Sequence, residues 1–215
     1  MLTADYQDLL ALWKRSHFCF YQLRFKGASF PATLALATTL KRWEPNLRLI
    51  ANDMMPAIDH PEVFDGLHLG QQDLAACSDR ELQRLLGRRP NFELGISTHD
   101  LAELRNTVAL HLNPDYIAVG PCYSTDSKLD TNPVLDAQQL LAMLSAIEKE
   151  ESLPARIVFI GGLNTVRIGD CLQKIASWRP GGPARSLQFQ YAGIAMFRQA
   201  QEIQACNQMF AELQT

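Results

Sequence analysis

The feature that most constrains the fold is the alternation of short apolar runs with stretches of helical periodicity. Seven apolar runs are typical of strands, at residues 18–24, 47–51, 66–69, 92–96, 115–120, 156–162 and 187–193. Helices are expected between and after them, near residues 31–43, 78–87, 100–110, 135–149, 164–175 and 196–213. Repeated strand–helix units with nearly continuous apolar strands predict a parallel sheet covered by helices.

The length of the chain favours one α/β domain over residues 1–215, and 47% of the residues are hydrophobic, enough for a sizeable core. We therefore expect a TIM (β/α)8-type barrel, in which the carboxyl ends of the strands build the active site. An open doubly wound sheet is the alternative. No GxGxxG motif follows any of the strands, so nothing favours a dinucleotide site.

Charge and cysteine content limit the partners. A net charge of −3 argues against nucleic acid and anionic membranes as partners, and no run approaches membrane-spanning length. The N-terminal stretch, residues 1–18, is expected to be an amphipathic helix rather than a signal peptide. The five cysteines show no metal-binding spacing, which is typical of reduced thiols in a cytoplasmic protein. Cys122 as a nucleophile is a minor alternative to a packing role.

Polar residues follow the first predicted strand in the segment YQLRFKG. Strand alternation predicts that Gln22, Arg24 and Lys26 point the same way, toward the mouth of the barrel. Two neighbouring cations behind a buried run favour an anion site, and a solvated strand end is the alternative.

Acidic residues follow the second and third predicted strands. Asn52 and Asp53 end one strand, and Asp73 lies close behind the next. An Asx pair after a strand is often a turn or a helix cap. Two carboxylates on neighbouring strands that face basic residues also suit Mg²⁺, which takes one or two carboxylates together with substrate phosphate oxygens. His68, within the third strand, is expected to pack rather than to bind metal, because Mg²⁺ disfavours imidazole.

Hydroxyl groups and one lysine follow the fourth and fifth strands. Ser97 is expected either to cap the next helix or to bind a ligand, and Ser97 and Asp100 both fit a capping box. The segment VGPCYSTDSK, residues 119–128, brings several hydroxyl groups beside Lys128. Hydroxyl groups, free amides and an ammonium group are what a phosphate or diphosphate needs.

Small residues follow the last two strands. Gly161 and Gly162 let backbone amides approach a phosphate at a helix start, and small residues also follow Tyr191. Paired loops after the last barrel strands are a common phosphate site. Together with the cationic, metal-assisted end, this pattern predicts a diphosphate substrate that meets a monophosphate substrate.

The whole series of motifs resembles that of a known family. The segments QLRFK, AND, HLGQQDL, LGISTHD, YIAVGPCYSTDSK and IGGL resemble, in order and spacing from about residue 20 to 165, the thiamine-phosphate synthase family. The resemblance implies a TIM barrel that joins hydroxymethylpyrimidine diphosphate to a thiazole phosphate with release of pyrophosphate. It implies small-molecule partners and leaves a homo-oligomer open.

The resemblance also implies roles for individual residues. The pyrimidine diphosphate would contact Gln22, Leu23, Arg24, Phe25, Lys26, Asn52, Ser97 and Lys128, among which Arg24, Lys26, Ser97 and Lys128 would act in catalysis. Asp53 and Asp73 would hold Mg²⁺. The thiazole phosphate would contact Thr125, Asp126, Ser127, Gly161, Gly162, Tyr191 and Ala192.

Two departures from the family pattern keep alternatives open. The family opens with a strand before its first helix, whereas this chain starts directly in that helix, so the first barrel strand is expected to be missing. Tyr191-Ala192-Gly193 replaces a Val-Ser-Ala-like run and loses one hydroxyl group. A non-catalytic barrel that binds a thiamine precursor is one alternative. A thiazole tautomerase is another, although Pro121 stands where that branch has a histidine.

Overall fold

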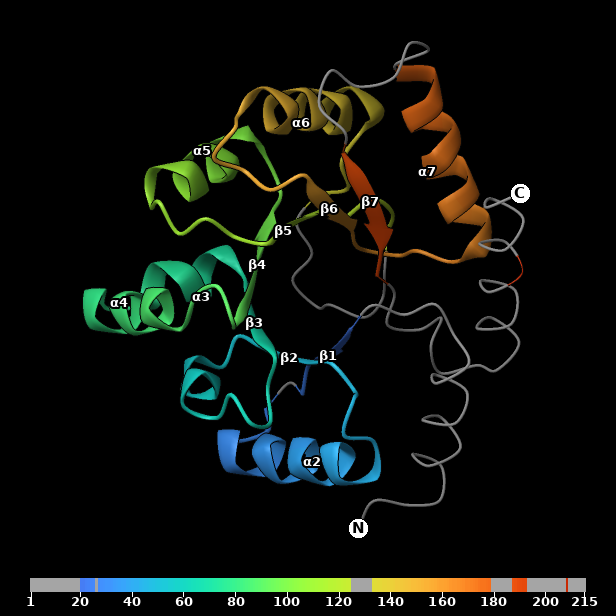
Figure 1. Cartoon of the computed structure of the whole chain (residues 1–215). Helices are drawn as coiled ribbons and strands as arrows, with labels where there is room; N and C mark the ends of the chain where they lie inside the picture. The colour runs from blue at the N-terminus through green and yellow to red at the C-terminus, as the bar shows by residue number, and fades with distance from the viewer. Residues whose placement is uncertain (1–19, 26, 125–132, 179–186, 193–207, 209–215) are drawn as a thin grey trace.

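The computed structural model describes residues 20–25, 27–124, 133–178, 187–192 and 208, and the other residues are drawn as a grey trace in Figure 1. The helices expected at 1–18 and 196–213 therefore lie outside the described residues, apart from position 208. The same holds for residues 125–132 and 179–186.

The described chain contains one sheet of seven parallel strands whose spatial order follows the chain order. The strands are β1 (Tyr21–Leu23), β2 (Leu49–Asn52), β3 (Gly66–Leu69), β4 (Glu93–Thr98), β5 (Tyr116–Val119), β6 (Arg156–Phe159) and β7 (Gln188–Tyr191). Figure 1 shows that they curl around a common axis. No ladder among the described residues joins β7 to β1. The predicted barrel-type architecture is confirmed as a curled, seven-stranded parallel sheet.

Helices cover the outside of this sheet (Figure 1). They are α2 (Phe30–Trp43), α3 (Gln71–Ala76), α4 (Asp79–Arg88), α5 (Leu101–Ala109), α6 (Ala137–Lys149) and α7 (Thr165–Trp178), with a 3₁₀ turn η1 at Met55–Asp59. The five longer helices match predicted ones to within three residues at each end. The short elements α3 and η1 were not predicted.

Local hydrogen bonds explain where these helices begin. Ser78 and Glu81 form a capping box at α4, and Asp136 forms one with Gln139 at α6. At α5 the sequence left two candidates for the cap. Asp100 caps the helix, because its side chain accepts a hydrogen bond from the amide of Glu103 at 2.8 Å. Ser97 therefore does not cap this helix, and its hydroxyl group can contact another group.

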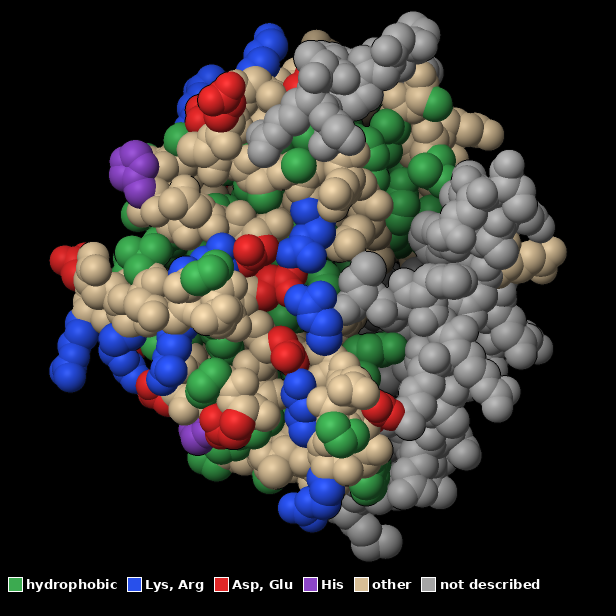
Figure 2. Space-filling model, in the orientation of Figure 1, with side chains coloured by type: hydrophobic (Ala, Val, Ile, Leu, Met, Phe, Trp, Pro, Cys, Tyr) green, Lys and Arg blue, Asp and Glu red, His purple; other side chains and the backbone are tan. Residues whose placement is uncertain are grey.

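Charged residues cluster where the strands begin. Glu93, the first residue of β4, is only 7% exposed and accepts hydrogen bonds from both Arg48 and Arg156. Asp115, just before β5, pairs with Arg89. Figure 2 shows basic and acidic side chains alternating across the middle of the face turned to the viewer. Opposite charges are thus paired at the amino ends of the strands.

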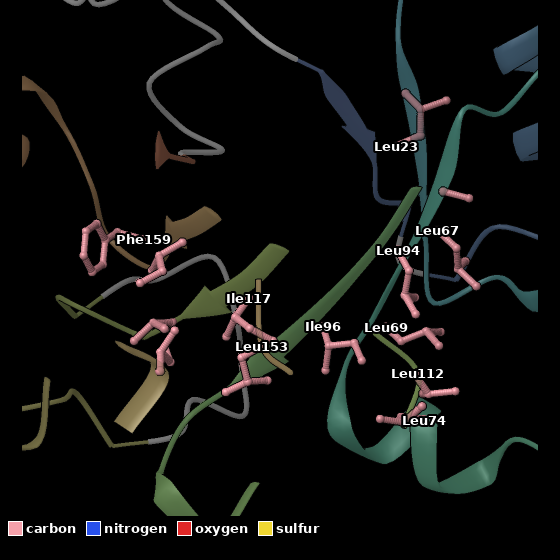
Figure 3. Packing of buried hydrophobic residues seen from close by; sticks show 14 of the residues in the cluster. Leu23, Leu67, Leu69, Leu74, Leu94, Ile96, Leu112, Ile117, Leu153 and Phe159 are labelled. Atoms are coloured by element: carbon pink, nitrogen blue, oxygen red, sulfur yellow. The ribbon is translucent and has the colours of Figure 1, made fainter. Parts of the chain in front are cut away.

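The apolar core lies between the sheet and the helices. Leu67, Leu69, Leu94 and Ile96 come from alternate positions of β3 and β4, and Figure 3 shows them grouped with Leu74 of α3 and other core residues. They are at most 3% exposed. Because successive side chains of a strand point to opposite faces, the residues between them point into the barrel.

Glycines make room for large side chains inside the barrel. A β-carbon at Gly95 would lie 2.0 Å from the ring of Tyr116, and one at Gly66 would lie 2.4 Å from the carbonyl oxygen of Glu93. Both distances are far below van der Waals contact. The interior is therefore filled by Tyr116 and other inward-pointing side chains, in agreement with the packed interiors of small barrels.

Candidate active site

The carboxyl ends of β1 and β2 are joined by a chain of amide and carboxylate groups. The Gln22 amide donates a hydrogen bond to Asn52 Oδ1, and Asn52 Nδ2 donates to Asp53 Oδ2. Asn52 is buried, whereas Asp53 is exposed. This contact agrees with the predicted direction of Gln22, and Arg24 lies two residues further along the chain, just after β1.

Asp53 and Asp73 approach each other across Gly70. Asp53 has φ 55°, so the chain turns sharply after β2, and its Oδ1 accepts a hydrogen bond from the amide of Gly70 at 2.9 Å. A β-carbon at Gly70 would lie 3.1 Å from Asp73 Oδ2 and 3.7 Å from Asp53 Oδ1. Two carboxylates from different elements therefore flank one point at the edge of the sheet.

These two carboxylates suit a hard divalent cation. They offer oxygen donors only, and Mg²⁺ prefers a small number of carboxylates completed by water and phosphate oxygens. No group of three or more metal-binding side chains occurs among the described residues. A pair of carboxylates fits a metal that is shared with a phosphate-bearing ligand better than it fits a closed protein site.

Ser97, at the end of β4, forms a hydrogen bond with a buried histidine. His68 Nε2 lies 2.8 Å from Ser97 Oγ, and His68 Nδ1 lies 3.0 Å from the hydroxyl of Tyr116. The prediction that His68 packs inside the protein is confirmed: it is 6% exposed and stacks on Tyr116. The sequence did not reveal its link to Ser97.

Two further residues complete this end of the site. Gln71, in the first turn of α3, donates to the carbonyl oxygen of Ser97 at 2.6 Å and was not singled out from the sequence. Its position in the segment HLGQQDL, directly after a strand, was the available signal. Arg24 is partly buried and has no ion-pair partner among the described residues. Its guanidinium group can therefore bind a ligand anion.

The two glycines after β6 form a tight turn in front of α7. Gly161 and Gly162 have φ 89° and 63°, and a β-carbon at Gly162 would lie 2.4 Å from the carbonyl oxygen of Ser124. Neither glycine amide has a hydrogen-bond acceptor among the described residues. Free amides at the start of a 14-residue helix can bind an anion.

Arg167, in the first turn of α7, ties this turn to the loop after β5. Its guanidinium donates to the carbonyl oxygen of Gly162 at 2.5 Å and to that of Ser124 at 3.4 Å, and it lies over the ring of Tyr123. Sequence reasoning missed this residue, and the available signal was an arginine four positions after the Gly-Gly-Leu run. The cation sits beside the predicted phosphate end.

The contribution of β7 differs from the expectation. The amide of Ala192 donates to the carbonyl oxygen of Phe159 at 2.9 Å, so this amide belongs to the sheet. The ring of Tyr191 packs 5.5 Å from that of Phe159. In this arrangement the turn at Gly161 and Gly162 is the better placed donor for a phosphate.

The remaining predicted residues divide into two groups. The side chain of Leu23 is buried in the core, and Phe25 packs against that core, so their side chains contribute packing rather than polar contacts. The other predicted residues lie outside the described part of the chain; they are Lys26, Thr125, Asp126, Ser127 and Lys128. Their roles stay predictions.

Cys122 is a packing residue. It is 8% exposed and its thiol donates to the carbonyl oxygen of Val119 at 3.6 Å. The hydrogen bond with Cys171, together with burial, raises the pKa of the Cys122 thiol. A protonated, buried thiol is a poor nucleophile, so the minor alternative of a catalytic cysteine is not supported.

Comparison with known proteins identifies the family. The family model described as "Thiamine monophosphate synthase" matches residues 8–178. The chain belongs to this family. It is 32% identical to a thiamine-phosphate synthase from Methanospirillum hungatei over 70% of this chain and 68% of that protein. It is 35% identical to one from Psychrobacter sp. over 66% of this chain and 62% of that protein. The aligned part thus spans about two thirds of each thiamine-phosphate synthase, and the sequence-based resemblance is confirmed.

A solved structure supports the same architecture. The crystal structure of a 3-hexulose-6-phosphate synthase matches 95% of this chain and 92% of its own with a TM-score of 0.59. At 14% identity this likeness bears on the fold of the thiamine monophosphate synthase family member and on nothing more. Among the described residues, no helix is long and apolar enough to cross a membrane.

Proposed function

We propose that the chain is a thiamine-phosphate synthase, a transferase that joins hydroxymethylpyrimidine diphosphate to a thiazole phosphate and releases pyrophosphate. One observation carries the proposal in a chain of this family. The side chains of Gln22, Asn52, Asp53 and Asp73 form one oxygen-rich group at the carboxyl edge of the sheet. Ser97 lies on the same edge, at the end of β4.

The diphosphate end combines a cation with a metal site. Asp53 and Asp73 would hold Mg²⁺, and bound Mg²⁺ would neutralise charge on the diphosphate oxygens. Arg24, which has no ion-pair partner among the described residues, can bind the same oxygens, and Lys26 and Lys128 are predicted to join it. Gln22 and Asn52 offer amide groups, which suit the nitrogen atoms of an aminopyrimidine ring.

The residues suit a reaction that begins with departure of the leaving group. The bond between the pyrimidine methylene carbon and the diphosphate oxygen breaks, and the bonding electrons leave with pyrophosphate. The amino group of the ring stabilises the resulting cation, while Arg24 and the Ser97 hydroxyl stabilise the negative charge of the leaving group. The thiazole nitrogen then donates its lone pair to the methylene carbon. No protein nucleophile is needed, in agreement with the buried state of Cys122.

The second substrate needs an anchor that keeps its nitrogen atom close to the methylene carbon. The amides of Gly161 and Gly162, at the start of α7, can bind its phosphate, and Arg167 adds a positive charge beside them. Holding both reactants in this way replaces an encounter in solution by a reaction within one complex.

The test measures formation of thiamine phosphate from the two substrates with and without Mg²⁺. We expect Mg²⁺-dependent product from the wild type and a loss of at least about 100-fold in Asp53→Ala and Asp73→Ala, because each removes a charged ligand of the metal. Asp79→Ala is the matched control, since Asp79 is an exposed carboxylate at the start of α4. It should retain full activity.

Absence of product from folded wild-type protein with both substrates and Mg²⁺ would contradict the proposal. Tight binding of thiamine phosphate without turnover would then identify a binding protein. Turnover that is equal in the presence of a metal chelator would contradict the assignment of Asp53 and Asp73.

A further inference from the structure

Three polar side chains from three adjacent strands form a continuous chain inside the barrel. Tyr116 of β5 contacts His68 of β3 at 3.0 Å, and His68 contacts Ser97 of β4 at 2.8 Å. The chain ends at the residue that is predicted to bind the diphosphate. Every link runs between different strands, so the contacts depend on the curvature of the sheet and not on local sequence.

All three residues are buried, which restricts how they can rearrange. Ser97 is 7%, His68 6% and Tyr116 1% exposed. The His68 and Tyr116 rings stack at 5.6 Å, and the Tyr116 ring stacks in turn on Phe20 at 5.2 Å. Buried polar groups must keep their hydrogen bonds, because the loss of one costs about 1–3 kcal/mol. The imidazole is therefore held in one orientation.

The direction of the hydrogen bonds depends on which ring nitrogen of His68 carries the hydrogen. Burial, and the nearby carboxylate of Glu93, raise the pKa of Tyr116, so its hydroxyl group keeps its proton and is able to donate to His68 Nδ1. When this hydroxyl donates to His68 Nδ1, the neutral imidazole carries its hydrogen on Nε2. The Nε2–H group then faces Ser97 Oγ, which acts as the acceptor. A serine hydroxyl that accepts on one side directs its own hydrogen elsewhere.

We propose that His68 is a positioning residue that sets the direction of the Ser97 hydroxyl group. It donates from Nε2 to Ser97 Oγ, so that the hydroxyl hydrogen of Ser97 points to the diphosphate of the pyrimidine substrate. This inference rests on the proposed function for the identity of the ligand. The orientation of the imidazole does not depend on the proposed function. In this role His68 acts on the substrate through Ser97 and not by direct contact.

The geometry also distinguishes this role from simple filling of space. An apolar residue of similar size would pack against Tyr116 equally well but would remove the hydrogen-bond partner that His68 gives to Ser97 Oγ and to the Tyr116 hydroxyl. Gln71 fixes the backbone of the same residue by donating to the Ser97 carbonyl oxygen at 2.6 Å. The backbone of Ser97 is thus held by one residue and its hydroxyl group by another.

Two variants test the contributions of the two ring nitrogen atoms of His68 separately. In His68→Gln the side-chain amide reaches the position of Nε2 and keeps a donor for Ser97. In His68→Asn the shorter amide reaches only the position of Nδ1 and keeps the contact with Tyr116 alone. We expect His68→Asn to lower kcat about tenfold, the worth of one hydrogen bond, with an unchanged KM for thiazole phosphate. His68→Gln should restore most of the kcat.

A double-mutant cycle tests whether His68 acts through Ser97. In a Ser97→Ala background the hydroxyl group is absent, so adding His68→Asn should cause no further loss of kcat. Losses that multiply, or an equal loss in His68→Asn and His68→Gln with thermal unfolding unchanged, would overturn the proposal. Thermal unfolding of each variant identifies any variant that fails to fold. In that case a measurement on the wild-type protein tests the proposal instead.

That measurement is ¹⁵N NMR of the imidazole group of His68 in the wild-type protein, which needs no activity. We expect a neutral ring with its hydrogen on Nε2, and a hydrogen on Nδ1 would overturn the proposal. A wild type that makes no product, with the hydrogen on Nε2, would contradict the proposed function and leave the imidazole assignment intact. An active wild type with the hydrogen on Nδ1 would contradict this inference alone.

Discussion

At the scale of single residues, the site depends on a few positions with unusual local demands. Asp53 has φ 55°, a conformation that most residues avoid and that aspartate and asparagine tolerate best. The sharp turn that results directs its carboxylate to the Gly70 amide and toward Asp73. Residue type and backbone conformation therefore support each other at this position.

Asp53→Asn tests the charge of this side chain separately from its shape. Asparagine tolerates the same φ and keeps an oxygen acceptor for Gly70, so the free energy of unfolding should change by less than about 0.5 kcal/mol. The Mg²⁺ concentration needed for half-maximal activity should rise at least about tenfold, because one negative charge is lost. Chemical denaturation and a Mg²⁺ titration of product formation measure the two effects. An unchanged Mg²⁺ requirement would contradict the metal assignment.

Gly95→Ala tests the packing of the barrel interior. A β-carbon would lie 2.0 Å from the Tyr116 ring, which is locked among buried neighbours, so the variant should lose about 1–3 kcal/mol of unfolding free energy. The matched control is Gly87→Ala in α4, where no atom lies within 4 Å of the added carbon. It should gain about 0.5–1 kcal/mol. Urea denaturation of both variants measures the difference, and equal stabilities would contradict the packing described here.

At the scale of secondary-structure elements, the sequence predicted those elements that a local pattern of apolar residues determines. The apolar runs located all seven strands, and GLHL at residues 66–69 matched β3 in full. α3 and η1 are too short to show a periodic apolar stripe, so pattern alone could not reveal them. Ser97 illustrates a different limit. Its neighbours in sequence predicted a helix cap, whereas its partner in space comes from β3.

The phosphate end shows the same division between local and distant contacts. The pair Gly161 and Gly162 marked a tight approach of the backbone, and their positive φ values fit that prediction. Arg167, in α7, contacts Ser124, which lies 43 residues earlier in the chain. The sequence shows an arginine near the two glycines, but no local pattern links Ser124 to α7, so the contact itself could not be predicted.

Arg167→Ala tests whether this link supports the phosphate end. The variant removes a positive charge and two hydrogen bonds to carbonyl oxygens, so KM for thiazole phosphate should rise about tenfold. KM for the pyrimidine diphosphate should stay within about twofold, because α7 lies at the other end of the site. Arg167→Lys keeps the charge without the planar fork and should fall between the two. Steady-state kinetics with each substrate varied in turn provide the check, and an equal rise in both KM values would contradict it.

At the scale of the whole molecule, the two ends of the sheet have different tasks. The carboxyl ends of the strands carry exposed carboxylates and, after β6, two glycine amides that have no acceptor in the part of the chain that the structure describes. The amino ends carry paired charges, among which Glu93 links Arg48, just before β2, to Arg156 at the start of β6. The amino ends of the strands therefore stabilise the fold, and the carboxyl ends are available to contact ligands. Barrels of this kind usually separate the two roles in this way.

Glu93→Gln tests the stabilising end. The variant leaves two arginines without their shared carboxylate. Arg156 is largely buried, whereas the side chain of Arg48 is 48% exposed and partly screened by water. We therefore expect a loss of about 2 kcal/mol, less than the 3–5 kcal/mol of a fully buried pair. The exposed Glu62→Gln is the control and should change stability by less than about 0.5 kcal/mol. Thermal denaturation measures both, and equal midpoints would contradict the role of Glu93.

The identity of spatial order and chain order in the sheet has a consequence for how the molecule is made. Each strand pairs with the one synthesised just before it, so a chain that emerges from the ribosome can add its strands one at a time. The side chains of Gln22, Asn52, Asp53, Asp73 and Ser97 have all been translated before β5 begins. The end of the site that would receive the pyrimidine diphosphate can thus take shape while the phosphate end is still being synthesised.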